Sequence, residues 1–213
     1  MLDRKEVLRY LGCRTENALL ERMAVQAEKL VLQAAAPVHV FRRTAIRVED
    51  DTTHVGTTAL VSRDLAAHLN GCREVYLLAL TLGPGIDRLI RRSEVADPPM
   101  VPVLQACAAV YTEFCADEIQ KSLEAQAGRC GLYLRPRYSP GYGDFSLENQ
   151  RFFFDSLEIT KRIGVFLTDS FLMIPCKSIT AVLGLSEKGT QCHVGKCMSC
   201  KLNKCPFRKR KLQ

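Results

Sequence analysis

Apolar side chains recur at helical spacing in two long stretches of the chain, and each stretch predicts a long helix. Residues 15–36 keep one apolar face for about five turns, until Pro37 ends the pattern. Residues 103–126 make the second long helix. Shorter helices are predicted at residues 3–11, where Asp3 and Glu6 have capping-box spacing, at residues 62–70, and from Gly83 to about Val95.

Shorter apolar or β-branched runs lie between these helices and predict strands. The runs cover residues 38–48, 54–60, 74–82 and 178–185, and a hairpin is expected at 165–174 around Thr168-Asp-Ser170. Helices and hairpins follow one another without a regular strand–helix–strand alternation. The pattern therefore predicts an α+β fold with a mixed, largely antiparallel sheet and flanking helices.

Composition and charge divide the chain into two parts. The 213 residues are 47% hydrophobic and 25% charged, which suffices for a buried core. Residues 188–213 contain eight basic and no acidic side chains, so 22 bases face 23 acids in residues 1–187 and the net charge of +7 belongs to the tail. We expect a folded domain at 1–187 and a basic, cysteine-rich tail at 188–213. The charged N-terminus and the lack of a long apolar run predict a cytoplasmic protein.

The tail contains four closely spaced cysteines, whereas the other six of the ten are scattered singly. Cys192, Cys197, Cys200 and Cys205 are separated by four, two and four residues. Four thiolates suit tetrahedral zinc or an iron–sulfur cluster, and in a reducing compartment metal ligation is a more natural explanation than disulfides. The alternative is a flexible tail with incidental thiols, and its lysines could instead bind an acidic partner or nucleic acid.

The loop RPRYSPGYGDFSLENQ, residues 135–150, carries an unusual mixture of side chains. Arg137 offers a guanidinium fork for a carboxylate, Pro140-Gly141 makes a turn that exposes main-chain groups, and Tyr142 offers a phenol with an aromatic face. Such a set suits a small zwitterionic or cationic ligand. The alternative is a rigid surface turn in which Tyr138 and Tyr142 cover the core.

The pattern Arg137-x-x-x-Gly141-Tyr142, with Pro140 before the glycine, resembles the S-adenosylmethionine-binding signature of the activation domain of cobalamin-dependent methionine synthase. The similarity extends from residue 2 to about residue 185. The resemblance implies that Arg137 pairs with the ligand carboxylate, that Ser139 and Gly141 contribute main-chain contacts, and that Tyr142 lies beside the sulfonium.

The resemblance also implies two more ligand contacts, Asp3 and Glu113. Asp3 can equally be the N-cap of the first helix, and Glu113 with Asp117 can equally form a solvated helix face. Downstream of Tyr142, the segment from Gly143 departs from some full-length enzymes, so the wall facing cobalamin is expected to differ.

In that family the domain holds S-adenosylmethionine above the cobalt while an external electron donor reduces cob(II)alamin. The sequence has no barrel for homocysteine or folate, and its four histidines do not form a cobalamin-binding Asp-x-His-x-x-Gly motif. The resemblance thus implies a stand-alone module, with S-adenosylmethionine as ligand and cobalamin on a partner.

The partners implied are a cobalamin-binding methionine synthase or related corrinoid protein and a flavodoxin- or ferredoxin-like electron donor. No membrane is expected, and nucleic acid is not expected as the main partner. The competing hypothesis is a non-enzymatic metal-binding module that docks nucleic acid or an acidic partner through its tail.

Overall fold

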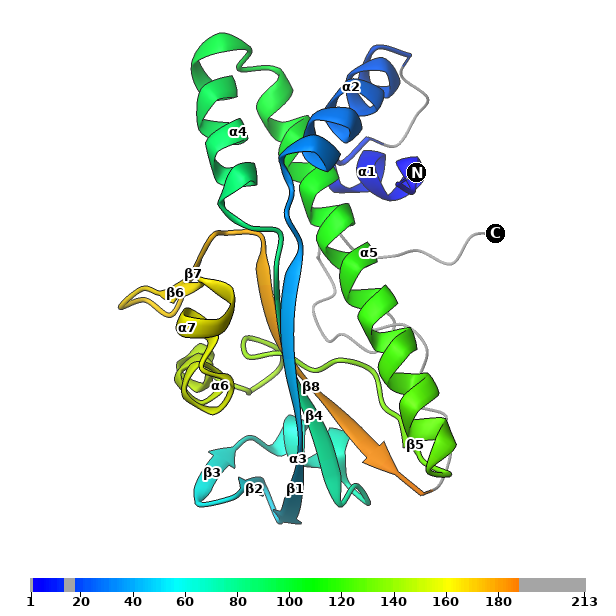
Figure 1. Cartoon of the computed structure of the whole chain (residues 1–213), viewed down its shortest axis with the longest axis vertical. Helices are drawn as coiled ribbons and strands as arrows, with labels where there is room; N and C mark the ends of the chain where they lie inside the picture. Colours follow the sequence, from blue (N-terminus) through cyan, green and yellow to red (C-terminus); the bar gives the residue numbers. More distant parts are fainter. Residues whose placement is uncertain (1, 14–17, 188–213) are drawn as a thin grey trace.

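The computed structural model describes residues 2–13 and 18–187 (Figure 1). The helices are α1 (Arg4–Tyr10), α2 (Ala18–Ala34), α3 (Arg63–Leu69), α4 (Pro84–Ala96), α5 (Met100–Arg129), α6 (Gln150–Leu157) and α7 (Ile159–Ile163), with a 3₁₀ turn η1 (Leu147–Asn149). The strands are β1 (Val38–Glu49), β2 (Thr52–Val55), β3 (Thr58–Val61), β4 (Glu74–Thr81), β5 (Tyr133–Leu134), β6 (Phe166–Leu167), β7 (Met173–Ile174) and β8 (Ser178–Ser186).

Six of these strands form one antiparallel sheet in the order β3-β2-β1-β4-β8-β5. β4 is central because its sequence, EVYLLALT, is almost entirely apolar and can be buried on both faces. It pairs with β1 on one side and along its whole length with β8 on the other. This sheet and its helices confirm the predicted α+β fold.

The two faces of the sheet are covered by different helices. Alternate side chains of a strand point to opposite faces, so neighbouring residues of β4 and β8 pack against different helices. Tyr76, Leu78 and Leu183 pack with Leu123 of α5 on one face. Leu77 and Val182 belong to a second cluster on the other face, which also contains residues of α3, α6 and α7. β8 therefore lies between two helical layers, and the loop beside it can reach both.

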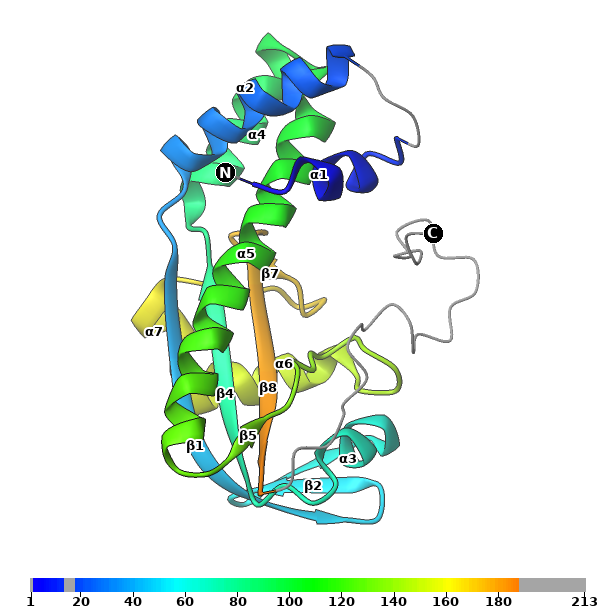
Figure 2. The ribbon, with the colours of Figure 1, turned by 90° about the vertical axis from the view of Figure 1, so that its right-hand side faces the viewer.

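A third apolar cluster joins α1, α2, α4 and the first half of α5 at one end of the molecule. α5 is long enough to leave this helical end and run along the sheet (Figure 1). In the side view, α1 at one end and α3 at the other lie on the same side, and β8 lies between them (Figure 2). None of the helices in the described part of the chain is long and apolar enough to cross a membrane.

The clearest departure from the predicted elements is at residues 54–60, which we expected to form one strand. The structure has two short strands, β2 and β3, joined by a tight turn at Gly56. The φ of Gly56 is 59°, a left-handed conformation that glycine adopts without a steric penalty. Threonine and valine, which favour strands, lie on both sides of Gly56, so composition alone did not reveal the turn.

Candidate functional site

The loop that follows β5 runs along the outer edge of β8. The amide of Arg135 donates to the carbonyl of Gly184 (2.8 Å), and Tyr138 and Val182 exchange two main-chain hydrogen bonds of 2.9 and 2.8 Å. The loop is therefore an irregular continuation of the sheet rather than a free surface turn. It ends beside α3 and leads into η1 and α6 (Figure 2).

Arg135 faces the end of α3. Its two terminal nitrogens donate to the carbonyl oxygens of His68 (2.5 Å) and Asn70 (2.6 Å), which have no partner further along the helix. The ring nitrogen Nε2 of His68 lies 2.9 Å from the carbonyl oxygen of Pro136. Arg135 thus caps a helix and ties the loop to it, and no ligand is needed to explain its position.

Arg137, by contrast, faces α5 and is held by three of its side chains. Nη2 donates to Glu113 (2.9 Å) and Asp117 (2.7 Å), and Nη1 donates to Gln120 (2.9 Å). Positions 113, 117 and 120 are spaced by four and three residues, which places them on one stripe of the helix. Arg137 is only 5% exposed, so it is a buried part of this cluster rather than a free surface side chain.

The cluster adds a feature that neither interpretation of the α5 acids predicted, an ion pair with Arg137. The side chains of Glu113 and Asp117 are 48% and 60% exposed, yet both form an ion pair with Arg137. Glu113 and Asp117 therefore contact both solvent and Arg137. Two carboxylates against one guanidinium give the cluster a formal charge of −1, which favours a ligand that brings positive charge. Whether Glu113 and Arg137 themselves touch a ligand remains a prediction.

Gly141 and Tyr142 form a tight turn at the end of the motif. The amide of Tyr142 donates to the carbonyl of Ser139 (3.1 Å), and the φ of Gly141 is 92°. This positive φ favours glycine, and a Cβ at Gly141 would also come within 3.1 Å of the Leu147 side chain, which would have to shift.

Tyr142 stands edge-on to Tyr138, with ring centroids 5.7 Å apart, and is 40% exposed. The pKa of its phenol is raised, first because the surrounding protein desolvates it and second because Glu113 is nearby. Tyr142 is therefore a neutral phenol at physiological pH, with part of its surface open to solvent.

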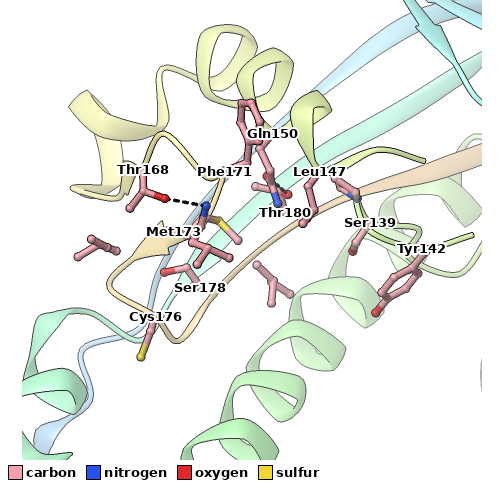
Figure 3. Close-up of a pocket in the computed structure, with 14 residues that line it drawn as sticks. Ser139, Tyr142, Leu147, Gln150, Thr168, Phe171, Met173, Cys176, Ser178 and Thr180 are labelled. Atoms are coloured by element: carbon pink, nitrogen blue, oxygen red, sulfur yellow. Dashed lines mark hydrogen bonds between the residues drawn. The ribbon is translucent and has the colours of Figure 1, made fainter. Parts of the chain in front are cut away.

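A cavity of about 530 Å³ adjoins this turn (Figure 3). Ser139 and Tyr142 lie on one side of it, and the β6–β7 hairpin lies on the other. Its walls are mainly apolar, and Gln150 and Thr180 form a buried polar pair between them. The predicted residues Ser139 and Tyr142 thus share one cavity. Gln150 and Thr180 were not among the residues predicted from the sequence to line it.

Asp3 is the N-cap of α1. Its Oδ1 accepts from the amides of Lys5 (2.9 Å) and Glu6 (3.4 Å), as the capping interpretation expected. Across residues 2–13 and 18–187 no hydrogen bond or ion pair joins Asp3 to the residues of the motif. Its ligand contact remains a prediction.

Asp144 is a loop residue whose role the sequence did not reveal. Its carboxylate accepts from the hydroxyl of Ser62 (2.5 Å) and from the amides of Arg63 and Asp64 (3.1 Å each) at the start of α3. The pKa of Asp144 is lowered, chiefly by the Ser62 hydrogen bond. The departure from the family pattern after Tyr142 thus includes a second anchor on α3.

The four predicted metal ligands, Cys192, Cys197, Cys200 and Cys205, lie outside the described residues. Within the described ranges, no group of three or more His, Cys, Asp or Glu side chains is placed to hold a metal ion. A metal site in the tail therefore stays a prediction.

The protein is therefore an α+β protein whose arginine–glycine–tyrosine motif lies in a loop beside the β8 edge of an antiparallel sheet. The family model described as vitamin B12 dependent methionine synthase, activation domain, matches residues 105–211, which is half of the chain. The chain belongs to this family. The match extends beyond residue 185, where we expected the resemblance to end, and includes the four tail cysteines.

The chain is also similar to a solved structure described as the crystal structure of the MetH reactivation domain bound to AdoHcy. The two share 15% sequence identity with a TM-score of 0.66, over 89% of this chain and 75% of that chain. At this identity the likeness concerns the fold. No curated protein matches the chain significantly.

Proposed function

We propose that this protein binds S-adenosylmethionine at the motif loop and supports the reductive remethylation of cob(II)alamin on a separate cobalamin-dependent methionine synthase or related corrinoid protein. The observation that carries the proposal is the position of the family motif. Arg137 faces the α5 acids, while Ser139 and Tyr142 open onto an apolar cavity of about 530 Å³. A ligand with a charged amino-acid end and a flat, weakly polar end suits these two surroundings.

The charges of the cluster fit the charges of this ligand. The side chain of Arg137 is 6% exposed, and Gln120 and Asp117 fix its orientation from α5. It is the cation available for the ligand carboxylate. Glu113 and Asp117 supply the excess negative charge that an ammonium or sulfonium group requires, and the neutral phenol of Tyr142 adds an aromatic face. Each of these side chains binds or orients, and none needs to transfer a proton.

The methyl group on the sulfonium and the reduced cobalt are reactive without further activation, so the chemistry belongs to the two cofactors. The contribution of the protein is position: it holds the donor with its methyl group turned toward an approaching partner. Tyr142 and the hairpin residues Leu172 and Ile174 line the cavity and are partly exposed to solvent. This exposed part of the cavity is the side from which a partner can reach the ligand.

Titration calorimetry with S-adenosylmethionine tests the binding step. The expected result is one site per chain, weakened by Tyr142→Ala and unchanged by Val95→Ala, a control at an exposed apolar residue of α4. For the second step, the protein is added to a cobalamin-dependent methionine synthase that lacks its own activation module, together with S-adenosylmethionine, reduced flavodoxin and cob(II)alamin. Appearance of the methylcobalamin spectrum only when this protein is present supports the proposal. No binding of S-adenosylmethionine by the wild-type protein refutes it.

The proposal extends to the tail through the sequence alone. Four cysteines on the chain that presents the methyl donor would shorten the path of the required electron, so an iron–sulfur cluster at Cys192, Cys197, Cys200 and Cys205 is proposed, with structural zinc as the competing assignment. Anaerobically purified protein with a cluster is brown, and dithionite bleaches it. Colourless protein with one equivalent of zinc rejects the electron relay. The tail would then be a structural or docking element, as in the competing hypothesis of an interaction module.

A further inference from the structure

Gln150, at the start of α6, is buried and lines the cavity beside the motif. Only 4% of its surface is exposed, and its Oε1 accepts a 2.7 Å hydrogen bond from the hydroxyl of Thr180. In the described part of the chain no hydrogen bond engages its Nε2. The fully buried polar side-chain atoms without a partner there are Thr53 Oγ1 and Arg135 Nε, so Nε2 of Gln150 is not sealed from the cavity.

The main chain of Thr180 offers a second polar edge at the same place. In an antiparallel strand, residues two apart direct their N–H and C=O groups to the same side. Val182 exchanges both hydrogen bonds with Tyr138, and the carbonyl of Gly184 accepts from Arg135, so even-numbered residues of β8 point away from β4. Thr180 is the next even residue, beyond the point where the motif loop leaves the strand. Its N–H and C=O therefore point toward the cavity.

The hydrogen-bonding groups of Gln150 and Thr180 are surrounded by the apolar walls of the cavity. Leu147, Phe171 and Met173 are among the lining residues, and Figure 3 shows Gln150 and Thr180 between the motif side and the hairpin side. A flat heteroaromatic ring fits these surroundings, because its apolar faces can pack against the walls while its edge forms hydrogen bonds with Gln150 and Thr180. Adenine presents an amino donor directly beside a ring-nitrogen acceptor, and an amide group matches this pair.

We propose that Gln150 and the edge of Thr180 recognise the adenine base of the ligand, which makes Gln150 a specificity-determining residue. The inference rests on the proposed binding of S-adenosylmethionine. It places the amino-acid end of the ligand toward Arg137 and the base toward Gln150, on either side of Ser139 and Tyr142. The hydroxyl of Thr180 holds the amide so that Nε2 remains available to the base.

Three stable probes separate recognition of the base from a purely structural role. S-adenosylhomocysteine contains both ends of the ligand, adenosine lacks the amino acid, and S-ribosylhomocysteine lacks the base. Gln150→Leu should weaken S-adenosylhomocysteine and adenosine about tenfold each, because a ring nitrogen loses its donor, and leave S-ribosylhomocysteine unchanged. Arg137→Ala should give the complementary result, with adenosine unchanged and both homocysteine derivatives weakened.

Thr180→Val is the second variant, for the case in which Gln150→Leu does not fold. It removes the hydroxyl that orients the amide and keeps the main-chain edge, so adenosine should be weakened severalfold and S-ribosylhomocysteine not at all. An equal loss for all three probes, or no loss for adenosine, overturns the assignment of Gln150 while the proposed function stands. Wild-type protein that binds neither S-adenosylmethionine nor S-adenosylhomocysteine overturns both proposals.

Discussion

Arg135 and Arg137 stand two residues apart in one loop, yet they have opposite kinds of partner. Arg135 donates to two main-chain carbonyls at the end of α3, whereas Arg137 donates to three side chains of α5. The carbonyls belong to the end of α3, where intrahelical donors run out, so Arg135 completes the fold. The carboxylates of Glu113 and Asp117 are half-exposed, so we predict that they can exchange partners and that Arg137 can bind a ligand. The comparison suggests a rule: an arginine bound to main-chain carbonyls stabilises the fold, whereas one bound to half-exposed carboxylates is a candidate for ligand binding.

Arg137→Ala tests the ligand side of this comparison and has the largest expected effect. Loss of a charge-assisted contact to the ligand carboxylate should reduce the free energy of S-adenosylmethionine binding by about 2–4 kcal/mol, as measured by calorimetry. The free energy of unfolding should fall by about 1 kcal/mol, because the acids left behind remain partly solvated. A variant that binds like the wild type contradicts the ligand role of Arg137.

Arg135→Ala tests the structural side. Two helix-end carbonyls lose their donors, so the free energy of unfolding should fall by about 2–3 kcal/mol, as measured by urea denaturation. Binding of S-adenosylmethionine by the folded protein should be nearly unchanged. Arg135→Lys serves as the matched control and should recover part of the stability. If Arg135→Ala abolishes binding without loss of stability, the division of roles between the two arginines is wrong.

Two substitutions of Tyr142 distinguish the contribution of its ring face from that of its hydroxyl. Tyr142→Ala should weaken S-adenosylmethionine by about 1 kcal/mol, while Tyr142→Phe should cost less, since the face of the ring is retained. Calorimetry on both variants gives the comparison. Equal losses would argue against contact between the ring and the sulfonium.

Asp144→Asn tests the N-terminal end of α3, opposite the end that Arg135 caps, and has the smallest expected effect. Its pKa is lowered in the folded protein, so its stabilising contribution is present above the pKa of the unfolded chain, about 4, and is lost as pH falls through the lower folded value. Thermal melting between pH 7 and pH 3 should therefore show a shallower acid decline for Asp144→Asn than for the wild type. Parallel curves would show that the carboxylate does not stabilise α3.

Local patterns determined most of the elements. The central strand β4 followed from an apolar run too short for a helix, and α1 and α3 followed from Asp3 and Ser62 as N-caps, both of which the structure confirms. Local chemistry also selected the loop itself, because its mixture of arginine, proline, glycine and tyrosine is unusual for a simple turn. The turn at Gly56 was missed because residues that favour strands lie on both sides of it.

The partners of each side chain were decided by tertiary structure. The motif singles out Arg137, but the sequence does not reveal which groups Arg135 and Arg137 contact, because these partners come from α3 and α5. The same holds for Gln150 and Thr180, 30 residues apart, which meet only because α6 packs beside the edge of β8. Periodicity and capping depend on neighbours within a few residues, so the sequence determined helices, strands and a candidate motif. Pairing across the sheet depends on where distant elements pack, so only the fold decided which arginine faces the acids and which residues line the cavity.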